Sequence, residues 1–578
     1  MTSWERLHLN NVFQTVCALE SVVLRSFGPE GGHVLFTRDT GQALLTRNGT
    51  RILKALQLQH PVARMVVECV CKHSAATGDG SKTFVLLLAS LLRTIQATTT
   101  CGEAGRALAE RLLLFARQEF HHVIVGLLRL YGGTLVWWDD FVTPDTQESV
   151  QTLLVSFFST RLSQVHSDFI SDVTWKWIHG WSFTNTGPVP SLRFLNDHFS
   201  ALHTTLAGFP VGATRLIEGQ VIHRDFSTPC ILMNQRLVKA VTVTSPLLSN
   251  TMDTGDVFAV GDIGGASIVH YGAWMERSLR CVIANLQTLG VRVILSAVTQ
   301  PPALLSAATQ AGMCVVECIS DHELSLFTHL TGTLPVTDCW KVEPQQHIAL
   351  LSFCRPLQLG AHRYVHVSPR GSEEVVTSSS CSLLICAPGE GQTDQYANAF
   401  RDAVRMLLTA STNASESCLQ TNSPFSSPDS EAALEPGWLV TGGGTFEFIL
   451  SCSLLQNAAN VAHADVARLV AKAVLVVPRH ILGPRHFLET QSRVASFLAK
   501  HSHGTSLAQS EQSLQDPKVN IHGCKTISES DVGVESVSCK YQLLLAVLQC
   551  LTGVLRVDTM LWTHIVSQPD ASCEDDED

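Results

Sequence analysis

The sequence lacks the signals of several common protein classes. No stretch reaches the roughly 18 uninterrupted apolar residues of a membrane-spanning helix, and the start at Met1 lacks the basic region and apolar run of a signal peptide. The 18 cysteines form no C-x-x-C pair, so neither a zinc site nor a disulfide framework is indicated. Acidic residues outnumber basic ones by 51 to 40, which gives no reason to expect a nucleic-acid-binding face. We therefore expect a cytoplasmic protein with reduced cysteines that neither inserts into a membrane nor binds nucleic acid.

Length and composition indicate a globular chain of several parts. With 578 residues, the chain exceeds one ordinary domain of roughly 100 to 200 residues, so two to four compact units are expected. Hydrophobic residues make up 45% of the chain and charged residues only 16%, which excludes a largely disordered protein.

A glycine-bracketed aspartate is where the functional argument begins. The stretch Ala76-Thr77-Gly78-Asp79-Gly80-Ser81-Lys82-Thr83 runs into an apolar segment, which predicts a loop that opens a helix. Backbone N–H groups beside Gly78 and Gly80 and the positive end of that helix would bind an anion such as phosphate. Asp79 could hold Mg²⁺, and Lys82 would add a point charge. The same residues also fit a turn that merely caps a buried helix, and the spacing of a Walker A loop is absent.

Turn signals divide the N-terminal part of the chain into helices and one hairpin. Helical spacing predicts a helix over residues 10–25, and two short strands are predicted at 34–36 and 43–45. Further helices are predicted after Asn48-Gly49, from His60-Pro61 to the Gly78 turn, up to about Gly132, and from Val150 to about Trp181, followed by a loop over 184–190.

A change of character near Leu216 predicts an α/β unit, because short β-rich runs there alternate with helical stretches. The runs cover residues 221–222, 237–243, 291–296 and 313–316. A further strand pair, Arg363 to Val367 with Ser382 to Cys386, is expected to lead into a helix over about 393–408. Two polar stretches, 411–436 and 501–517, interrupt the helical pattern and are predicted to be exposed irregular segments.

The order of these turns resembles that of the group II chaperonins, the family of the thermosome and the cytosolic chaperonin containing TCP-1. The matching segments are Phe27-Gly28-Pro29-Glu30-Gly31 (L-G-P-x-G in the family), Thr46-Arg47-Asn48-Gly49 (T-N-D-G), Gly78 to Thr83 (G-D-G-T-T-T), Arg401-Asp402-Ala403-Val404 (H-D-A-L), Gly442 to Glu447 (G-G-G-A-x-E), Gly533-Val534-Glu535 (G-V-x-E-P) and Leu555-Arg556-Val557-Asp558 (L-R-I-D). Within the family, residues 26–93 are similar to the vertebrate chaperonin-like proteins of the Bardet-Biedl syndrome group.

The resemblance implies an α+β chaperonin fold in which a helical equatorial domain, a small intermediate domain and an α/β apical domain are nested discontinuously. The implied boundaries are 1–143 and 409–578 for the equatorial domain, 144–213 and 365–408 for the intermediate domain, and 214–364 for the apical domain. The two polar stretches would be flexible insertions of the equatorial domain. Where the family carries a helical lid, Leu247 to Ala266 is glycine-rich, which implies a degraded lid.

The resemblance also implies ATP and Mg²⁺ as cofactors. Asp79 would be the metal ligand, and the two catalytic positions would be Asp402, which orients the attacking water, and Asn48. The family has an aspartate at Asn48, and an amide cannot act as a base, so the resemblance implies at most a weak ATPase. Lys82 replaces a threonine and should favour nucleotide binding. The implied nucleotide-binding residues are Gly28, Pro29, Gly31, Gly49, Gly78, Asp79, Gly80, Ser81, Lys82, Thr83, Gly443, Gly444 and Glu535.

The function implied by the resemblance is that of an ATP-binding chaperonin-like protein that assists the folding and assembly of protein complexes. The implied client is the BBSome, which serves the primary cilium, and the implied partners are other chaperonin-like Bardet-Biedl proteins and cytosolic chaperonin subunits. The basal body or cilium is then a more specific location than the cytoplasm at large. Two alternatives stay open: an autonomous ring-forming, ATP-hydrolysing chaperonin, and a catalytically inert interaction scaffold.

Overall fold

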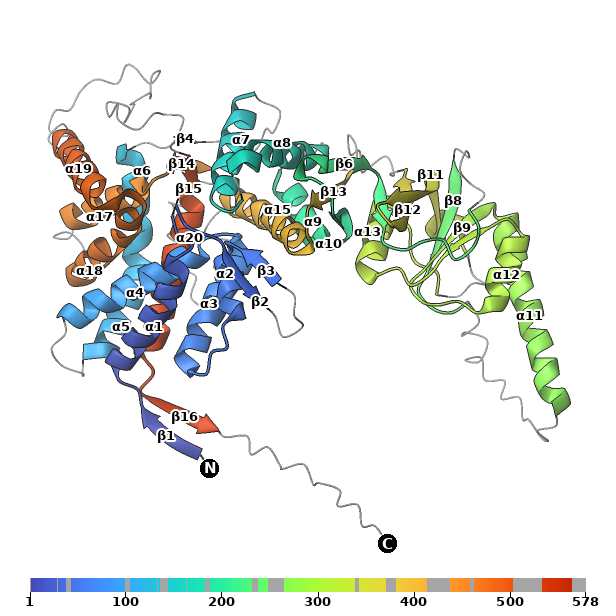
Figure 1. Cartoon of the computed structure of the whole chain (residues 1–578), viewed down its shortest axis with the longest axis horizontal. Helices are drawn as coiled ribbons and strands as arrows, with labels where there is room; N and C mark the ends of the chain where they lie inside the picture. The colour runs from blue at the N-terminus through green and yellow to red at the C-terminus, as the bar shows by residue number, and fades with distance from the viewer. Residues whose placement is uncertain are drawn as a thin grey trace, which may run out of the picture. The chain divides into compact units, whose positions relative to one another are not determined.

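The computed structural model divides the chain into two compact units (Figure 1). The first unit combines residues 1–34, 47–135 and 413–578, and the second combines 35–46 and 136–412. The structure describes residues 2–28, 30–37, 43–98, 104–131, 134–135, 144–162, 164–181, 188–230, 237–247, 265–337, 342–370, 381–412, 437–457, 462–502 and 533–563. Pro29, nearly all of the two predicted insertions and the core of the expected lid therefore lie outside the described residues. Helices and sheets occur in both units, which confirms the α+β class, whereas the three-domain boundaries stay a prediction.

The first unit is built around α4 (Ser81–Thr98). The segment from Phe84 to Leu92 is buried throughout, because its apolar residues cover every side of the helix. α4 packs against α1, α18 and α20, and each fully buried leucine or phenylalanine contributes about 1.5–3 kcal/mol to folding. The helices predicted between residue 10 and about residue 132 are confirmed. The helices of this unit besides α4 have these bounds: α1 (Leu9–Leu24), α2 (Gly49–Ala55), α3 (Pro61–Thr77), α5 (Ala104–Leu114), the π-helix η1 (Phe115–Glu119), α6 (Phe120–Tyr131), α17 (Thr445–Asn457), α18 (Ala464–Val474), α19 (Val476–Ser502) and α20 (Val537–Leu555).

By length and composition, α20 is the one helix in the described part of the chain that could cross a membrane. In this fold it packs against α3, α4 and α5, and 61% of its apolar window is buried inside the protein. A helix that is apolar on all sides is expected wherever a core surrounds it. Its place in the core therefore accounts for its composition.

Short strands connect distant parts of the first unit. β14 (Trp438–Thr441) lies between β15 (Val534–Ser536) and β4 (Thr134–Leu135) and is antiparallel to each of them. β1 (Thr2–Arg6) pairs with β16 (Thr559–Thr563) near the two ends of the described chain. The predicted hairpin is also present, as β2 (Val34–Thr37) with β3 (Ala43–Thr46), and residues 35–46 place nearly all of it in the second unit.

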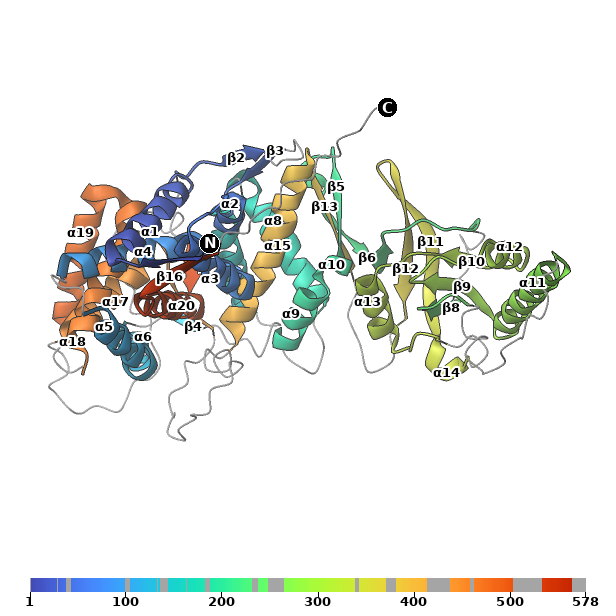
Figure 2. The same cartoon turned by 90° about the horizontal axis from the view of Figure 1, so that it is seen from below.

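The second unit contains a six-stranded sheet with the order β10-β9-β8-β11-β12-β7 (Figure 2). β8, β9 and β10 run parallel, which confirms the predicted α/β alternation, and the other three strands are antiparallel to their neighbours. Side chains of α11 and α12 pack on one face, with Val241 and Ile294, while those of α13 pack on the other, with Ala240 and Val293. The bounds are β7 (Gln220–Ile222), β8 (Val238–Val243), α11 (Gly265–Thr288), β9 (Val291–Ser296), α12 (Pro302–Gln310), β10 (Cys314–Val316), α13 (Asp321–Thr331), α14 (Pro344–His347), β11 (Ile348–Leu359) and β12 (His362–Pro369).

The predicted pairing of Arg363 to Val367 with Ser382 to Cys386 is wrong. β12 pairs with β11 and β7, whereas β13 (Cys381–Ala387) belongs to a separate sheet, parallel to β5 (His203–Ala207) and antiparallel to β6 (Arg215–Glu218). β11 was not predicted, because its Pro356 disfavours a strand. Pro356 is tolerated because β8 pairs only with Ile348 to Leu351, so the proline lies beyond that ladder.

The helical segment predicted from Val150 to about Trp181 is confirmed but begins earlier, at Pro144, and the helices over Pro188–Asp197 and Phe199–Leu202 were not predicted. The loop predicted over 184–190 is wrong at its end, because α9 begins at Pro188, where a proline suits the first helical turn. The bounds are α7 (Pro144–Ser159), α8 (Gln164–Gly180), α9 (Pro188–Asp197), α10 (Phe199–Leu202) and α15 (Glu390–Ser411).

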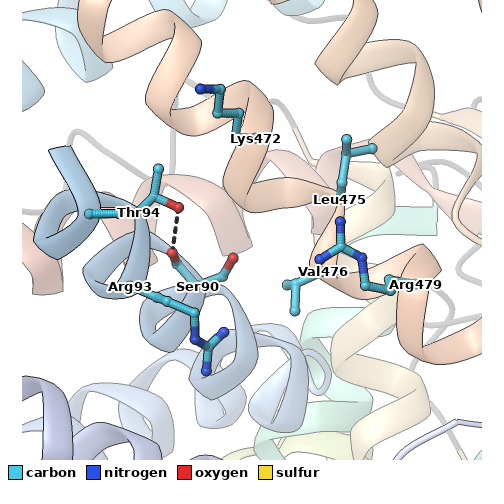
Figure 3. A pocket seen from close by; sticks show the side chains of 8 residues that line it. Ser90, Arg93, Thr94, Lys472, Leu475, Val476 and Arg479 are labelled. Carbon is cyan, nitrogen blue, oxygen red and sulfur yellow. Dashed lines mark hydrogen bonds between the residues drawn. The ribbon is translucent and has the colours of Figure 1, made fainter.

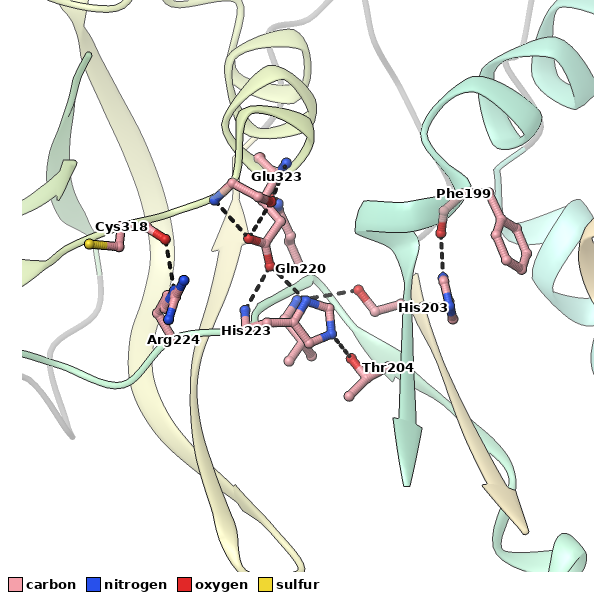
Figure 4. Close-up of polar contacts among 11 residues, drawn as sticks. Phe199, His203, Thr204, Gln220, His223, Arg224, Cys318 and Glu323 are labelled. Atoms are coloured by element: carbon pink, nitrogen blue, oxygen red, sulfur yellow. Dashed lines mark hydrogen bonds and ion pairs between the residues drawn. The ribbon is translucent and has the colours of Figure 1, made fainter. Parts of the chain in front are cut away.

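A buried carboxylate joins the six-stranded sheet to the sheet of β5, β13 and β6 (Figure 4). Glu323 on α13 accepts hydrogen bonds from the backbone N–H and the Nδ1 of His223, each at 2.7 Å, and from the hydroxyl of Ser320 at 2.6 Å. The Nε2 of His223 lies 3.0 Å from the hydroxyl of Thr204 on β5. Burial alone would raise the pKa of Glu323, but these hydrogen bonds lower it to about 2. The carboxylate therefore fixes the end of β7 against α13 and β5.

Gly219, between β6 and β7, lies at the same junction. Its φ is +83°, and a Cβ there would lie 2.4 Å from the carbonyl oxygen of Val367. Gly208 has nearly the same φ of +86°, but a Cβ there would meet no atom within 4 Å. The two glycines share a backbone conformation and differ in the space around it.

We expect Gly219→Ala to destabilise the protein more than Gly208→Ala. Both substitutions carry the strain of positive φ, roughly 1–2 kcal/mol, and overpacking at Gly219 adds roughly 1–3 kcal/mol. Urea unfolding followed by circular dichroism would show the larger drop in midpoint for Gly219→Ala. Equal drops would mean that the contact with Val367 relaxes without cost.

Candidate functional site

The loop between α3 and α4 is a tight turn closed by Asp79. α3 ends at Gly78, whose φ is +72° and whose N–H donates to the carbonyl of Ser74 at 2.9 Å. Asp79 Oδ1 accepts the N–H of Gly80 at 2.6 Å, and the carbonyl of Gly80 accepts the N–H of Phe84 at 2.8 Å as α4 begins. The capping interpretation therefore has a basis, since Asp79 accepts a backbone N–H. The same carboxylate lies at the N-terminal end of α4, where it could hold a metal ion against a bound anion.

A second helix begins at the same place. A Cβ on Gly49, the first residue of α2, would lie 2.5 Å from Cγ of Lys82 and 2.6 Å from Oγ of Ser81. Only glycine allows this approach of the two helix N-termini. Asn48 caps α2, because its Oδ1 accepts the N–H groups of Thr50 at 2.9 Å and Arg51 at 3.4 Å. Two positive helix ends are thereby brought together.

The turn after α1 lies against this pair of helix ends. The Nζ of Lys82 donates to the carbonyl of Ser26 at 2.6 Å, and Nη2 of Arg47 donates to the carbonyl of Gly28 at 3.0 Å. The turn is closed by the N–H of Gly31, which donates to the carbonyl of Gly28 at 3.2 Å. The structure thus brings together Gly28, Gly31, Asn48, Gly49 and the Gly78 to Thr83 stretch.

A partly buried ion cluster brings the C-terminal motifs together. Lys540 on α20 pairs with Glu447 at 2.8 Å and with Glu535 at 2.9 Å. Burial raises the pKa of Glu535 despite Lys540, and the negative charges of Glu447 and Asp79 raise it further. Glu535 is thus close enough to Asp79 to sense its charge.

The glycines of the Gly442 to Glu447 motif serve close packing. The N–H of Gly442 donates to the carbonyl of Gly533 at 2.6 Å, which holds the turn beside β15. Gly443 and Gly444 both have positive φ, and a Cβ on Gly444 would lie 2.5 Å from Cβ of Pro478 on α19. Contact with the nucleotide remains a prediction for both residues.

Asp402 belongs to the second unit, on α15. Its side chain is buried, with Oδ1 3.7 Å from Nη1 of Arg405, and Arg405 in turn donates to Asn196 at 3.1 Å. The role predicted for Asp402 in hydrolysis stays a prediction, and Pro29 lies outside the described residues.

The residues present fit a metal that is held partly by its ligand. Across the described ranges, no group of three or more His, Cys, Asp or Glu side chains could form a closed metal site. Mg²⁺ usually takes one or two protein carboxylates and completes its shell with substrate phosphates and water. Asp79 at the helix ends matches that pattern.

A cavity of about 420 Å³ lies elsewhere in the first unit, between α4, α18 and α19 (Figure 3). Three of its lining residues are basic, namely Arg93, Lys472 and Arg479. Arg93 is paired with Glu20 at 2.6 Å, and Arg479 lies over the ring of Phe487. None of the residues of the predicted site lines this cavity.

Comparison with known proteins decides the family. A sequence model of the TCP-1/cpn60 chaperonin family matches residues 19–415. The chain belongs to this chaperonin family. The chaperonin fold implied by the ordered turns is confirmed. The match covers the second unit and most of the N-terminal part of the first unit.

Among the relatives of this chaperonin, the "BBSome complex assembly protein BBS10" of Homo sapiens is 30% identical over 426 residues, which is 68% of this chain and 56% of that protein. The T-complex protein 1 subunit alpha of Tetrahymena pyriformis is 20% identical over 96% of this chain and 94% of its own length. The thermosome subunit alpha of Archaeoglobus fulgidus is 20% identical over 80% of this chain and 76% of its own. The similarity to the Bardet-Biedl group, to its tenth member in particular, is thus confirmed, although the chain spans little more than half the length of those relatives.

A buried histidine lies beneath the loop from Gly78 to Thr83 in this chaperonin. His73 on α3 is buried, its Nε2 lies 3.3 Å from the hydroxyl of Thr77, and its ring lies 5.9 Å from that of Phe84. Burial lowers the pKa of His73 to about 4, against the opposing effect of the negative charge of Asp79. The folded protein therefore resists protonation of this side chain.

We expect His73 to make folding less favourable in acid. The ordinary pKa of histidine is 6.5, so His73 in the unfolded chain binds a proton as the pH falls below that value, whereas in the folded protein it does so only near pH 4. This difference lowers the free energy of unfolding in acid by up to roughly 3 kcal/mol. Urea midpoints at about pH 7.5 and about pH 5 should therefore differ less for His73→Gln than for the unchanged protein. The exposed His122→Gln serves as the control, and an equal acid sensitivity of all three proteins would contradict this assignment.

Proposed function

We propose that this chaperonin binds ATP where α2 and α4 begin, and that it acts as an assembly factor for multi-subunit complexes. The observation that carries the proposal is the meeting of two helix N-termini beside the carboxylate of Asp79. Helix N-termini bind phosphate through free backbone N–H groups and the helix dipole. Asp79 would hold Mg²⁺, which would neutralise charge on the phosphates.

Nucleotide binding outweighs turnover in this proposal. The amide of Asn48 caps α2 and cannot accept a proton from water. The carboxylate left to orient water would be Asp402, on the second unit. An autonomous, rapidly hydrolysing chaperonin is therefore disfavoured, and the setting of Asp79 argues against an inert scaffold.

The relatives support a more specific client. Proteins named BBSome complex assembly protein share 30% identity with this chain over 68% of its length. We therefore propose the BBSome as the client, and other chaperonin-like Bardet-Biedl proteins and cytosolic chaperonin subunits as partners. This work would take place in the cytoplasm, including the basal body, in the service of the primary cilium.

Asp79→Asn tests the nucleotide site directly. The amide oxygen can still accept the N–H of Gly80, so the turn should persist, while the charge that holds Mg²⁺ is lost. We expect the affinity for Mg-ATP to fall at least about tenfold, with little change in the stability of the ligand-free protein. Calorimetric titration measures the first quantity and thermal unfolding the second.

The exposed Asp465→Asn on α18 of the same unit is the matched control and should bind Mg-ATP normally. If Asp79→Asn also binds Mg-ATP as the unchanged protein does, Asp79 only closes the turn. The scaffold alternative would then lead.

Asn48→Asp should raise ATP hydrolysis. A carboxylate can accept the same N–H groups of α2, so the cap should be retained. A restored acid-base group contributes on the order of 100- to 10,000-fold, and less if domain movement limits the cycle. Phosphate release measures the rate, and Asn48→Ser, which keeps a cap without a carboxylate, should show no rise. A rise that survives the addition of Asp402→Ala would contradict the role assigned to Asp402.

A further inference from the structure

Arg47 is a buried cation that the proposed function does not use. Its residue is only 8% exposed, and one of its nitrogens, Nη2, donates to the carbonyl of Gly28. Its Nε is buried and has no hydrogen-bond partner, and no carboxylate pairs with the guanidinium within the part of the chain that the structure describes. A buried charge without a counter-ion is costly, so an anion bound beside this guanidinium would offset that cost.

Lys82 places a second cation beside the first. Arg47 and Lys82 donate to the carbonyls of Gly28 and Ser26, which lie in the same turn. Both charges help to lower the pKa of His33, for which partial burial is the larger cause. Gly49, two residues after Arg47, abuts the side chain of Lys82 where α4 begins. The two cations therefore share one side of the meeting point of α2 and α4.

The net charge of the residues where α2 and α4 begin differs from that of the chaperonin motifs they resemble. At the positions of Arg47, Asn48 and Lys82, the segments T-N-D-G and G-D-G-T-T-T carry 0, −1 and 0, which sums to −1. This chain carries +1, 0 and +1, which sums to +2. The site is thus more positive by three charges. A polyphosphate entering it would need less neutralisation by a divalent ion.

We propose that Arg47, with Lys82, binds the terminal phosphates of the nucleotide directly, so that nucleotide binding persists without Mg²⁺. Arginine suits this role because its planar guanidinium offers two parallel N–H groups to a phosphate. The inference rests on the proposed function, and it concerns the polyphosphate rather than the base. Mg²⁺ held by Asp79 then adds affinity for a nucleotide whose phosphates Arg47 and Lys82 already bind without the metal.

Calorimetric titration of the full-length protein with ATP, in EDTA and in excess Mg²⁺, tests the inference. We expect metal-free ATP to bind within about tenfold of Mg-ATP, because two cations take over part of the role of the metal. Arg47→Gln keeps a donor for Gly28 but loses the charge, and it should weaken metal-free binding by about 10- to 100-fold and Mg-ATP binding by less. Asp79→Asn should not weaken metal-free binding.

Two further variants guard against misfolding and long-range effects. Arg47→Lys keeps the charge, so it should retain more metal-free binding than Arg47→Gln, and circular dichroism checks that both are folded. Lys54→Thr removes an exposed cation from the last turn of α2 and should leave both affinities unchanged. Inorganic tripolyphosphate should compete with metal-free ATP, because the proposed contacts reach only phosphate.

The outcomes separate this inference from the proposed function. If ATP binds only with Mg²⁺ and Arg47→Gln has no effect, the inference is overturned and the proposed function stands. If ATP fails to bind but tripolyphosphate binds in a manner that depends on Arg47, the nucleotide function fails and the anion site stands. If neither binds, both proposals fail.

Discussion

The absence of a side chain at Gly49 is the constraint on which the candidate site depends. A single Cβ there would overlap both Ser81 and Lys82, and α2 could not begin where α4 begins. That contact aligns two helix N-termini, sets Asn48 as a cap beside them, and positions Lys82 to reach the carbonyl of Ser26. The Gly28 turn lies against this meeting point, and the charge of Asp79 beside it contributes to the raised pKa of Glu535.

The charges around this point are arranged unequally. Glu447, Lys540 and Glu535 form a partly buried cluster in which two carboxylates share one ammonium group, and desolvation raises the pKa of Glu535. Arg47 and Lys82 each donate to a backbone carbonyl of the turn after α1. A backbone carbonyl carries no net charge, so these two hydrogen bonds position the cations without cancelling their charge. A site that retains charge in this way is suited to holding a nucleotide rather than to releasing it.

Sequence reasoning succeeded where local chemistry decides the structure. The Gly-Asp-Gly turn, the proline that starts α3 and the alternation of strands and helices after Leu216 are all local signals, and the structure contains the corresponding elements. It failed where contacts with distant segments decide the structure. Pro356 is acceptable in β11 only because the pairing with β8 ends before it. The partners of β13, which are β5 and β6, are distant from it in the sequence. Arg47 was also missed, because a charged residue in a turn normally faces solvent. Its burial beside Gly28 depends on contacts that no local pattern indicates.

Hydrogen exchange of the backbone amides with and without ATP tests the central claim most directly, since it reports where a ligand is bound without relying on turnover. The claim is that the phosphates of a nucleotide bind where α2 and α4 begin. We expect saturating ATP to slow exchange in peptides that cover Asn48 to Arg51 and Gly78 to Phe84, and in the turn from Ser26 to Gly31. Unchanged exchange in these three segments, with ATP shown to be bound, would contradict the claim and place the nucleotide elsewhere in the protein.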